Sequence, residues 1–297
     1  LISNYFTFDG GKAEGYKIRN LCYEQDMNDS VMTHSVGFLK DVVRFTVENV
    51  EMKQVRIAIK DSRTTRDASK AGADYYPVGA LAGTVSQSTV RNIFLADVSI
   101  TAPMAGGVMG YVKESSIRQI VANDDIRIGN DIELTYAKGN YAGSKITSTL
   151  QYLTEPSEYT VFLGGIAGMA VKDSMDNIKV RAKVEDLSSE TTPSTLGGLA
   201  GIFAHNDNSF RLFNDTLELK AATAEYGAGF SMISGGKAMG GLFGEVAAAP
   251  SDWQVMSNLY SSIILENCRV DSLKISNGKT ESVFAGGLVG RVSSGKL

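Results

Sequence analysis

The chain has 297 residues, 29 of them basic and 33 acidic, with a net charge of −4; this length suits one large domain or two ordinary ones. Glycine, at 31 residues, exceeds its usual share of about 7%, whereas proline is scarce at 5 residues. This composition excludes collagen and proline-rich disorder. The sequence has no Lys/Arg-rich run and a pI near 5.4, which argues against nucleic acid and anionic membranes as partners.

The two cysteines, Cys22 and Cys268, stand almost the whole chain apart, which excludes CxxC, zinc-finger and disulfide-framework spacings. The longest uncharged apolar stretch, residues 159–171, is shorter than the roughly 20 residues that span a bilayer, so no membrane insertion is expected. The chain begins at Leu1 without an initiator Met or a signal-peptide pattern. We interpret it as a mature product or an excised piece of a larger protein.

A glycine motif recurs along the chain, with the pattern apolar, Gly, Gly or Ala, Leu/Ile/Val, any residue, Gly. A degenerate copy at residues 36–39 precedes six full copies at 78–83, 105–110, 163–168, 196–201, 239–244 and 285–290. The first and last glycines of the full copies are Gly79, Gly83, Gly106, Gly110, Gly164, Gly168, Gly197, Gly201, Gly240, Gly244, Gly286 and Gly290. Small residues at one point of every repeat indicate a bend or strand where neighbouring coils approach too closely for a side chain.

A second element follows most copies and reads apolar, polar, Asn, apolar, then an alternating run. Residues 46–57, 89–100 and 265–275 share this register, and looser copies stand at 18–21, 117–120, 175–178 and 210–213. The recurrent asparagines are Asn49, Asn92, Asn177 and Asn267. Asparagine tolerates the left-handed backbone at a corner, and its amide can hydrogen-bond to the Asn of the next coil.

The alternation has period two, which is typical of strands with one buried face, and no apolar series of helical spacing is sustained. Each unit is too short to bury its apolar side alone and must stack on its neighbours. The sequence therefore predicts an all-β fold, a parallel β-helix-like solenoid of about seven imperfect Gly-rich coils. We expect one domain over residues 1–297, with degenerate coils at 1–60 and the six glycine-motif coils at 78–292.

These residues resemble the GLUG-type repeat of large bacterial surface and secreted proteins, named for the Gly-Leu-x-Gly core that residues 287–290 display. The opening segments 8–11 and 16–21 are similar to the repeat region that precedes the protease in immunoglobulin-A-cleaving zinc metalloproteases of Gram-positive cocci. The resemblance covers roughly residues 5–292. It implies an extracellular or cell-surface location in a bacterium, and a scaffold shared by proteins with different functions.

No catalytic constellation is evident. A zinc protease requires HExxH or a related cluster, and the two histidines, His34 and His205, supply no ligand pair. No glycine segment continues into Lys-Ser/Thr at the spacing of a phosphate-binding loop. The polar clusters at 124–125, 130–131 and 206–208 are interpreted as solvated turns, with a structural Ca²⁺ or a catalytic carboxylate as the alternative. We expect no metal and no other cofactor.

Extra sequence enters before the glycine motifs, at about residues 60–77, 130–162, 221–238 and 247–262. Insertions of this kind usually emerge on one face of a solenoid, which would be a candidate binding face. Their aromatic rings suit contact with glycans or protein surfaces, although packing onto the solenoid wall is the alternative. The candidate ligand-binding residues are Tyr136, Tyr141, Tyr152, Tyr159, Tyr226 and Trp253. Cys268 takes an apolar slot and is expected in the core; Cys22 is expected to face outward.

Taken together, these features predict a non-catalytic extracellular solenoid, structural or adhesive, that displays loops to a host-surface protein, a glycan or another copy in a surface fibre. The first alternative is the substrate-recognition region of a secreted metalloprotease whose catalytic domain lies outside this chain. A more distant alternative is a carbohydrate-active β-helix enzyme.

Overall fold

A computed structural model describes residues 6–9, 16–26, 35–60, 77–130, 161–171, 174–188, 194–204, 216–220, 223–225, 232–247, 262–271, 273–276 and 283–293. The described residues form strands, bends and turns, without helix. Neighbouring strands pair in parallel throughout the sheets, so the prediction of an all-β stack of parallel strands is confirmed. Within these ranges no helix has the length and apolarity needed to cross a membrane.

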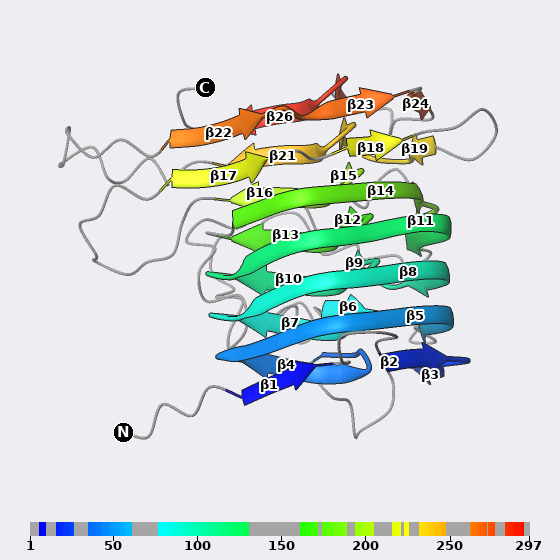
Figure 1. Cartoon of the computed structure of the whole chain (residues 1–297). Helices are drawn as coiled ribbons and strands as arrows, with labels where there is room; N and C mark the ends of the chain where they lie inside the picture. The colour runs from blue at the N-terminus through cyan, green and yellow to red at the C-terminus, as the bar shows by residue number, and fades with distance from the viewer. Residues whose placement is uncertain are drawn as a thin grey trace, which may run out of the picture.

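Three sheets run along the stack (Figure 1). The outer sheet has 13 strands: β1 (Phe6–Asp9), β2 (Tyr16–Arg19), β3 (Cys22–Asp26), β5 (Phe45–Lys60), β8 (Thr89–Thr101), β11 (Ser116–Asn130), β14 (Ser174–Asp186), β17 (Thr216–Lys220), β18 (Thr223–Glu225), β19 (Met232–Ser234), β22 (Ser262–Glu266), β23 (Arg269–Asp271) and β24 (Lys274–Ser276). The seven-stranded sheet contains β4 (Leu39–Val43), β7 (Ala82–Ser86), β10 (Met109–Lys113), β13 (Ala167–Val171), β16 (Ala200–Ala204), β21 (Phe243–Ala247) and β26 (Val289–Ser293). The six-stranded sheet contains β6 (Pro77–Gly79), β9 (Met104–Gly106), β12 (Val161–Gly164), β15 (Ser194–Gly197), β20 (Ala238–Gly240) and β25 (Phe284–Gly286).

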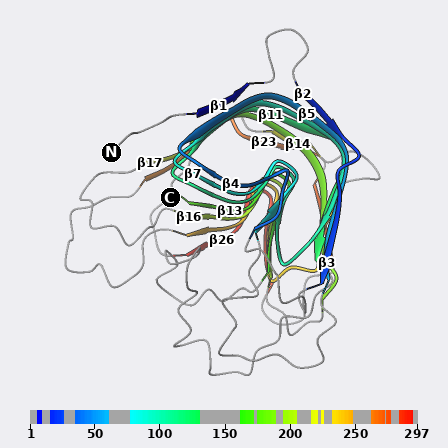
Figure 2. The same ribbon diagram turned by 90° about the horizontal axis from the view of Figure 1, so that it is seen from below.

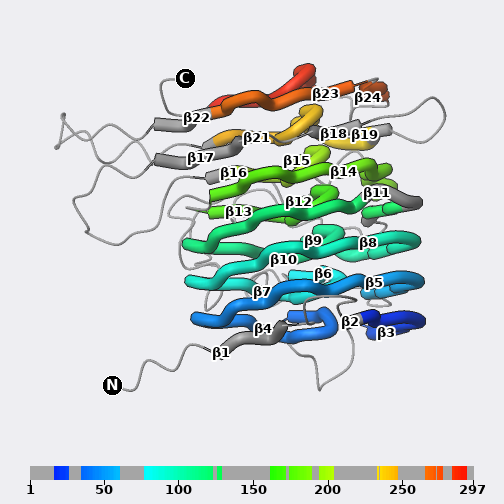
Figure 3. The backbone as a smooth tube through the Cα atoms, in the orientation of Figure 1, coloured from blue at the N-terminus to red at the C-terminus, as the bar shows by residue number. Residues whose placement is uncertain are grey.

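One coil passes through the three sheets in a fixed order, as β9, β10 and β11 show: six-stranded, seven-stranded, then outer sheet. Viewed along the stack, the outer sheet bends around the two inner sheets (Figure 2). The backbone tube climbs from the N-terminal to the C-terminal end, one strand level at a time (Figure 3). The pairing is therefore between successive coils, as in a solenoid.

The glycine motif forms the bend between the two inner sheets, and its glycines have different neighbours. A Cβ on Gly106 would lie 2.1 Å from the Met109 carbonyl oxygen of its own bend. One on Gly110 would lie 2.1 Å from the Val78 nitrogen in the preceding coil, and one on Gly165 would lie 2.3 Å from the Gly198 oxygen in the following coil. Since these neighbours are backbone atoms that cannot rotate away, a side chain does not fit at any of the three positions.

The outer sheet turns at residues with left-handed backbone angles, which cost ordinary side chains about 1–2 kcal/mol each. At the first corner these residues are Asn49 (φ 59°), Asn92 (54°), Gln119 (55°), Asn177 (54°) and Asn267 (53°). A second bend follows at Asn20 (58°), Gln54 (57°) and Asp97 (53°), and the turn that enters the sheet uses Arg44 (55°), Gln87 (49°) and Glu114 (49°). The four predicted asparagines therefore all occupy the first corner.

The core lies between the outer and inner sheets and continues from coil to coil. The fourth motif position contributes Leu81, Val108, Ile166, Leu199 and Leu242, each fully buried. The rings of Phe203 and Phe243, from adjacent strands, stack with centroids 4.6 Å apart. Burying a side chain of this size stabilises a fold by about 1.5–3 kcal/mol, so stacking supplies the core that one coil cannot form.

The register corrects two of the looser sequence alignments. Ile18 pairs with Met52 rather than with Val47, which stands two residues before the first corner, so Asn20 marks the second bend. Both bends require a residue with a left-handed backbone conformation. The pattern apolar, polar, Asn, apolar therefore fits either bend. In the fifth coil, Lys220 pairs with Asp176, so the first-corner segment lies later in the chain than residues 210–213, which are outside the described residues.

The prediction that all insertions share one face is wrong. Residues 61–76 and 131–160 connect the outer sheet to the six-stranded sheet, between β5 and β6 and between β11 and β12. Residues 248–261 instead connect the seven-stranded sheet to the outer sheet, between β21 and β22. Residues 226–231 fall inside the outer sheet, between β18 and β19. The insertions therefore enter at three different corners of the coil.

The cysteine predictions have different outcomes. Cys22 is exposed, as expected. Cys268 is only half-buried: it packs against the core, and its Sγ donates to the Glu266 carbonyl oxygen at 3.5 Å. Its expected full burial is wrong because it lies at the last level of the outer sheet, where the described residues add no further strand.

Candidate functional surfaces

The six predicted ligand-binding aromatics, Tyr136, Tyr141, Tyr152, Tyr159, Tyr226 and Trp253, lie outside the described residues. The same holds for His34, His205 and the cluster at 206–208. Within the part of the chain that the structure describes, no group of three or more His, Cys, Asp or Glu side chains is arranged to hold a metal ion. The candidate surfaces are therefore built from the strands that flank the insertions and from the outward faces of the sheets.

The first surface is the edge where the long outer strands end and the chain crosses to the six-stranded sheet. Three neighbouring strands β5, β8 and β11 reach this edge in register, with Ala58 paired to Thr101 and Thr101 to Gly129. Between β8 and β9 only residues 102–103 make the crossing. The coils before and after carry residues 61–76 and 131–160 at the same crossing. The edge therefore holds two long insertions on either side of one closed coil.

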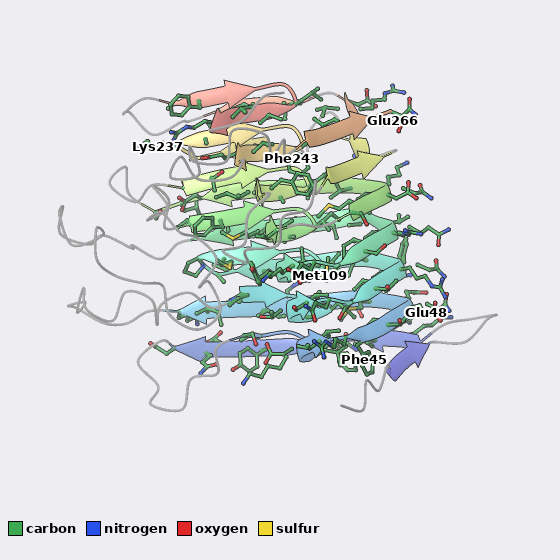
Figure 4. All side chains as sticks on the ribbon, turned by 90° about the vertical axis from the view of Figure 1, so that its left-hand side faces the viewer. Phe45, Glu48, Met109, Lys237, Phe243 and Glu266 are labelled. Carbon is green, nitrogen blue, oxygen red and sulfur yellow. The ribbon has the colours of Figure 1, made fainter. Side chains whose placement is uncertain are left out.

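The second surface is the outer sheet, where charged residues occupy positions in register. One column of paired positions contains, in chain order, Asp9, Glu48, Arg91, Arg118, Asp176, Lys220 and Glu266. Figure 4 shows Glu48 and Glu266 on the same side of the stack near its two ends. Glu48 is paired with the half-exposed Arg91. Glu48 is buried, but Arg91 is open to solvent, which screens the pair and limits its contribution to stability to about 1 kcal/mol or less.

Amide and charge contacts also link neighbouring corners on this face. Asn92 donates from Nδ2 to Oδ1 of Asn49 in the coil below, which joins two left-handed corners. Arg56 is paired with Asp97 one coil later, and its guanidinium also donates to the Asp97 carbonyl oxygen at 2.7 Å. The polar groups at these corners therefore hold one coil to the next.

Glu51, on this face, has a pKa that its neighbours lower. Lys53 Nζ lies 2.8 Å from Glu51 Oε1, and its hydrogen bond lowers the pKa of Glu51 below the usual value. The charges of Lys53, Lys17 and Arg19 act in the same direction, whereas partial burial acts against them. Lys53 also lies over the Phe94 ring at 5.3 Å, so one lysine joins an acid and an aromatic ring from adjacent coils.

Sequence reasoning missed a second apolar cluster, which lies apart from the main core. Its principal members are Met104, Tyr111, Phe162, Met169 and Ile202, all buried. They alternate with core residues along the inner strands, so the inner strands bury both faces in the middle coils. A signal for it exists in one column of the seven-stranded sheet, which is polar at both ends and apolar in the middle: Asp41, Thr84, Tyr111, Met169, Ile202, Glu245 and Arg291.

In comparisons with known proteins, no family model, no curated protein and no solved structure matches the chain. The described residues form a stack with paired polar groups on its outer sheet. At one edge, where the outer strands end, the chain carries insertions. These are features of a surface that positions segments relative to one another.

Proposed function

We propose that the chain is a non-catalytic, extracellular scaffold of a bacterial surface or secreted protein, a solenoid of about seven coils that displays inserted loops to a host-surface protein or glycan. The resemblance to the GLUG-type repeat supports the location. The glycine and asparagine repeats support the structural role, because the recurring glycines allow neighbouring backbones to approach and the recurring asparagines form the corners of the coil.

One observation carries this proposal: the crossing edge holds the insertion at 61–76 and the insertion at 131–160 on strands that are fixed in register. Parallel strands in adjacent coils lie about 4.8 Å apart, so the closed middle coil places the two attachment points about 10 Å apart. Both insertions contain tyrosine, at Tyr75 and Tyr76 in the first and at Tyr136 and Tyr141 among others in the second. Tyrosine rings give contact area at low entropic cost, and the attachment points of the two segments that carry them have a fixed spacing.

The closed coil also supplies a clean deletion experiment. Thr101 pairs with Gly129 and Met104 pairs with Phe162, so residues 130–161 can be replaced by the Ala-Pro link of residues 102–103 without changing the register. The same link can replace residues 59–76, since Ala58 pairs with Thr101 and Pro77 with Met104. Each variant keeps the register of the flanking strands and removes one insertion together with the strand-end residues Ile59 and Lys60, or Asn130 and Val161.

Glycan arrays and binding to host cells would be measured for the parent chain and both variants, with circular dichroism as the folding control. The proposal expects a ligand for the parent chain and loss of its binding, by tenfold or more, when one of the insertions is removed. Binding that persists unchanged in both folded variants would refute display by this edge. Release of reducing ends from a polysaccharide by the parent chain would refute the non-catalytic assignment.

A further inference from the structure

A column of charges with a single sign runs along the outer sheet beside the crossing edge. The long strands β5, β8, β11 and β14, side by side in Figure 1, hold its members in register, and β19 and β24 continue it. We call this the basic column, and in chain order it contains Cys22, Arg56, Ser99, Arg127, Lys183, Met232 and Lys274. Every charged member is basic, although the chain has a net charge of −4.

The charged members of the basic column face away from the core. Arg127, for example, stands between Ile126 and Ile128, which are both buried, so its own side chain is on the opposite face of the strand. The exposed cations are Arg56, Arg127 and Lys274, and the side chain of Lys183 is 40% exposed. The column is therefore a line of cationic groups on the surface of the outer sheet.

Sheet stability does not account for the sign of these charges. Arg127 and Lys183 occupy directly opposite positions on β11 and β14, and like charges at such positions destabilise a sheet. The column through Glu48 and Arg91 differs, because it contains both signs and these two residues form an ion pair. The basic column contains no acid with which its cations could alternate.

Two of the cations have acidic partners outside the column, and these contacts leave donors for a ligand. Arg56 donates to the Asp97 carbonyl oxygen and to its Oδ1. Lys183 Nζ lies 2.7 Å from Glu185 Oε2. A guanidinium has five N–H donors and an ammonium has three, so each partner orients its cation without using all of its donors.

The spacing along the basic column suits one extended chain with repeated negative groups. Strands of adjacent coils lie about 4.8 Å apart, so Arg56 and Arg127 are about 10 Å apart and the cations together span about 24 Å. The columns on either side contain acidic positions, Asp124 in one and Glu185 in the other. An anionic membrane or a nucleic-acid duplex is broader than this strip and would meet these acids. Single-stranded nucleic acid is bound by stacking on aromatic rings, which the column does not contain.

We propose that the basic column binds an acidic polysaccharide, whose carboxylate or sulfate groups contact its four cations. The arginines can form paired N–H···O bonds with such groups, and the lysines act as point charges. Arg56 stands five residues before the insertion at 61–76, and Arg127 four residues before the insertion at 131–160. The inference thus rests on the proposed function for the location of binding, and it names the ligand class as an acidic glycan.

Heparin and alginate, two acidic polysaccharides, and the neutral polysaccharide dextran are the probes, titrated onto the full chain in a calorimeter. We expect saturable binding of heparin or alginate that weakens as the salt concentration rises from about 50 to about 200 mM, because the contacts are ionic. We expect no binding of dextran. Failure of both acidic polymers to bind would overturn the proposal, and so would tighter binding of single-stranded DNA.

The variant that tests the column combines Arg127→Ser with Lys183→Ser, which copy Ser99 of the neighbouring coil. It should bind the acidic polymer at least tenfold more weakly than the parent chain. The control combines Arg118→Ser with Lys40→Ser, which remove the same charge at exposed positions outside the basic column. It should change binding less than twofold, with circular dichroism showing that both variants fold. Equal losses in the two variants would overturn the proposal.

The two insertion deletions separate this inference from loop display, because both leave Arg56 and Arg127 in place. Binding of the acidic polymer that survives both deletions but is lost in the basic-column variant would support this inference and refute display by the crossing edge. Binding that is lost with an insertion and unchanged in the basic-column variant would overturn this inference and leave the proposed function standing.

Discussion

Replacing Gly165 with alanine tests the stacking role of the motif glycines most sharply. The new Cβ would lie 2.3 Å from the Gly198 oxygen and 2.7 Å from Val180 Cγ2, about 1 Å short of ordinary contact. Two backbone hydrogen bonds cross this point, from Gly165 N to Gly198 O at 3.1 Å and from Ile166 N to Leu199 O at 2.9 Å. Forcing the two coils apart would weaken both bonds.

Three contributions determine the change in the free energy of unfolding of Gly165→Ala. Overpacking costs about 1–3 kcal/mol, and two weakened hydrogen bonds cost about 1 kcal/mol each. Alanine restricts the unfolded chain relative to glycine, which offsets about 0.4–1 kcal/mol. We therefore expect Gly165→Ala to lower the free energy of unfolding by about 2–5 kcal/mol.

Urea denaturation followed by circular dichroism measures this change, with Gly287→Ala as the matched control. The control has no described atom within 4 Å of its Cβ and no left-handed backbone angle, so it should be neutral or stabilising by up to about 1 kcal/mol. Equal denaturation midpoints for the two variants would refute the steric explanation of the motif.

Three further predictions concern the core, the corners and the outer face. Leu199→Ala should cost about 2–5 kcal/mol in thermal or urea unfolding and Leu288→Ala about half as much, because only Leu199 is fully buried; equal costs would contradict the stacked core. Asn92→Ala should be about 1–2 kcal/mol less stable than Asn92→Gly, since both lose the amide but only alanine is strained at φ 54°; equal stability would refute the corner assignment. Lys53→Met should raise the pKa of Glu51 toward the ordinary value of a glutamate, because it removes the hydrogen bond and the charge of Lys53, and an NMR titration measures the change. Because the folded pKa is depressed, this ion pair stabilises the fold above the unfolded pKa and is lost as the pH falls through the folded one; an unchanged pKa in the variant would contradict the contact.

The stacked parallel fold could be predicted from the sequence because its cause is repeated. A glycine that avoids a backbone atom, such as Gly106 or Gly110, is needed again in each coil, and so its signal accumulates along the chain. The second bend of the outer sheet gave no such signal. It is formed by Gln54 and Asp97 as well as by Asn20, so several residue types meet the same backbone requirement.

The surfaces were harder to predict because motif spacing does not tell which corner an insertion enters. Residues 248–261 precede an outer strand, whereas residues 131–160 precede a glycine motif, and only the strand bounds separate the two cases. The second apolar cluster was missed because period-two alternation was interpreted as one buried face. In the middle coils Tyr111 and Met169 are buried on the other face as well, so both phases of the alternation are apolar there.

The central claim is that successive repeats stack in register, one strand spacing apart. Glu51, Phe94, Val121, Lys179, Thr223 and Arg269 form one column of the outer sheet. Spin labels at Glu51→Cys and Arg269→Cys, in a background with Cys22→Ser and Cys268→Ser, are separated by five strand steps of about 4.8 Å, or about 24 Å. Pulsed electron paramagnetic resonance should return one narrow distance near this value, allowing for the length of the labels. A broad distribution, or a distance well beyond about 40 Å, would contradict the stack.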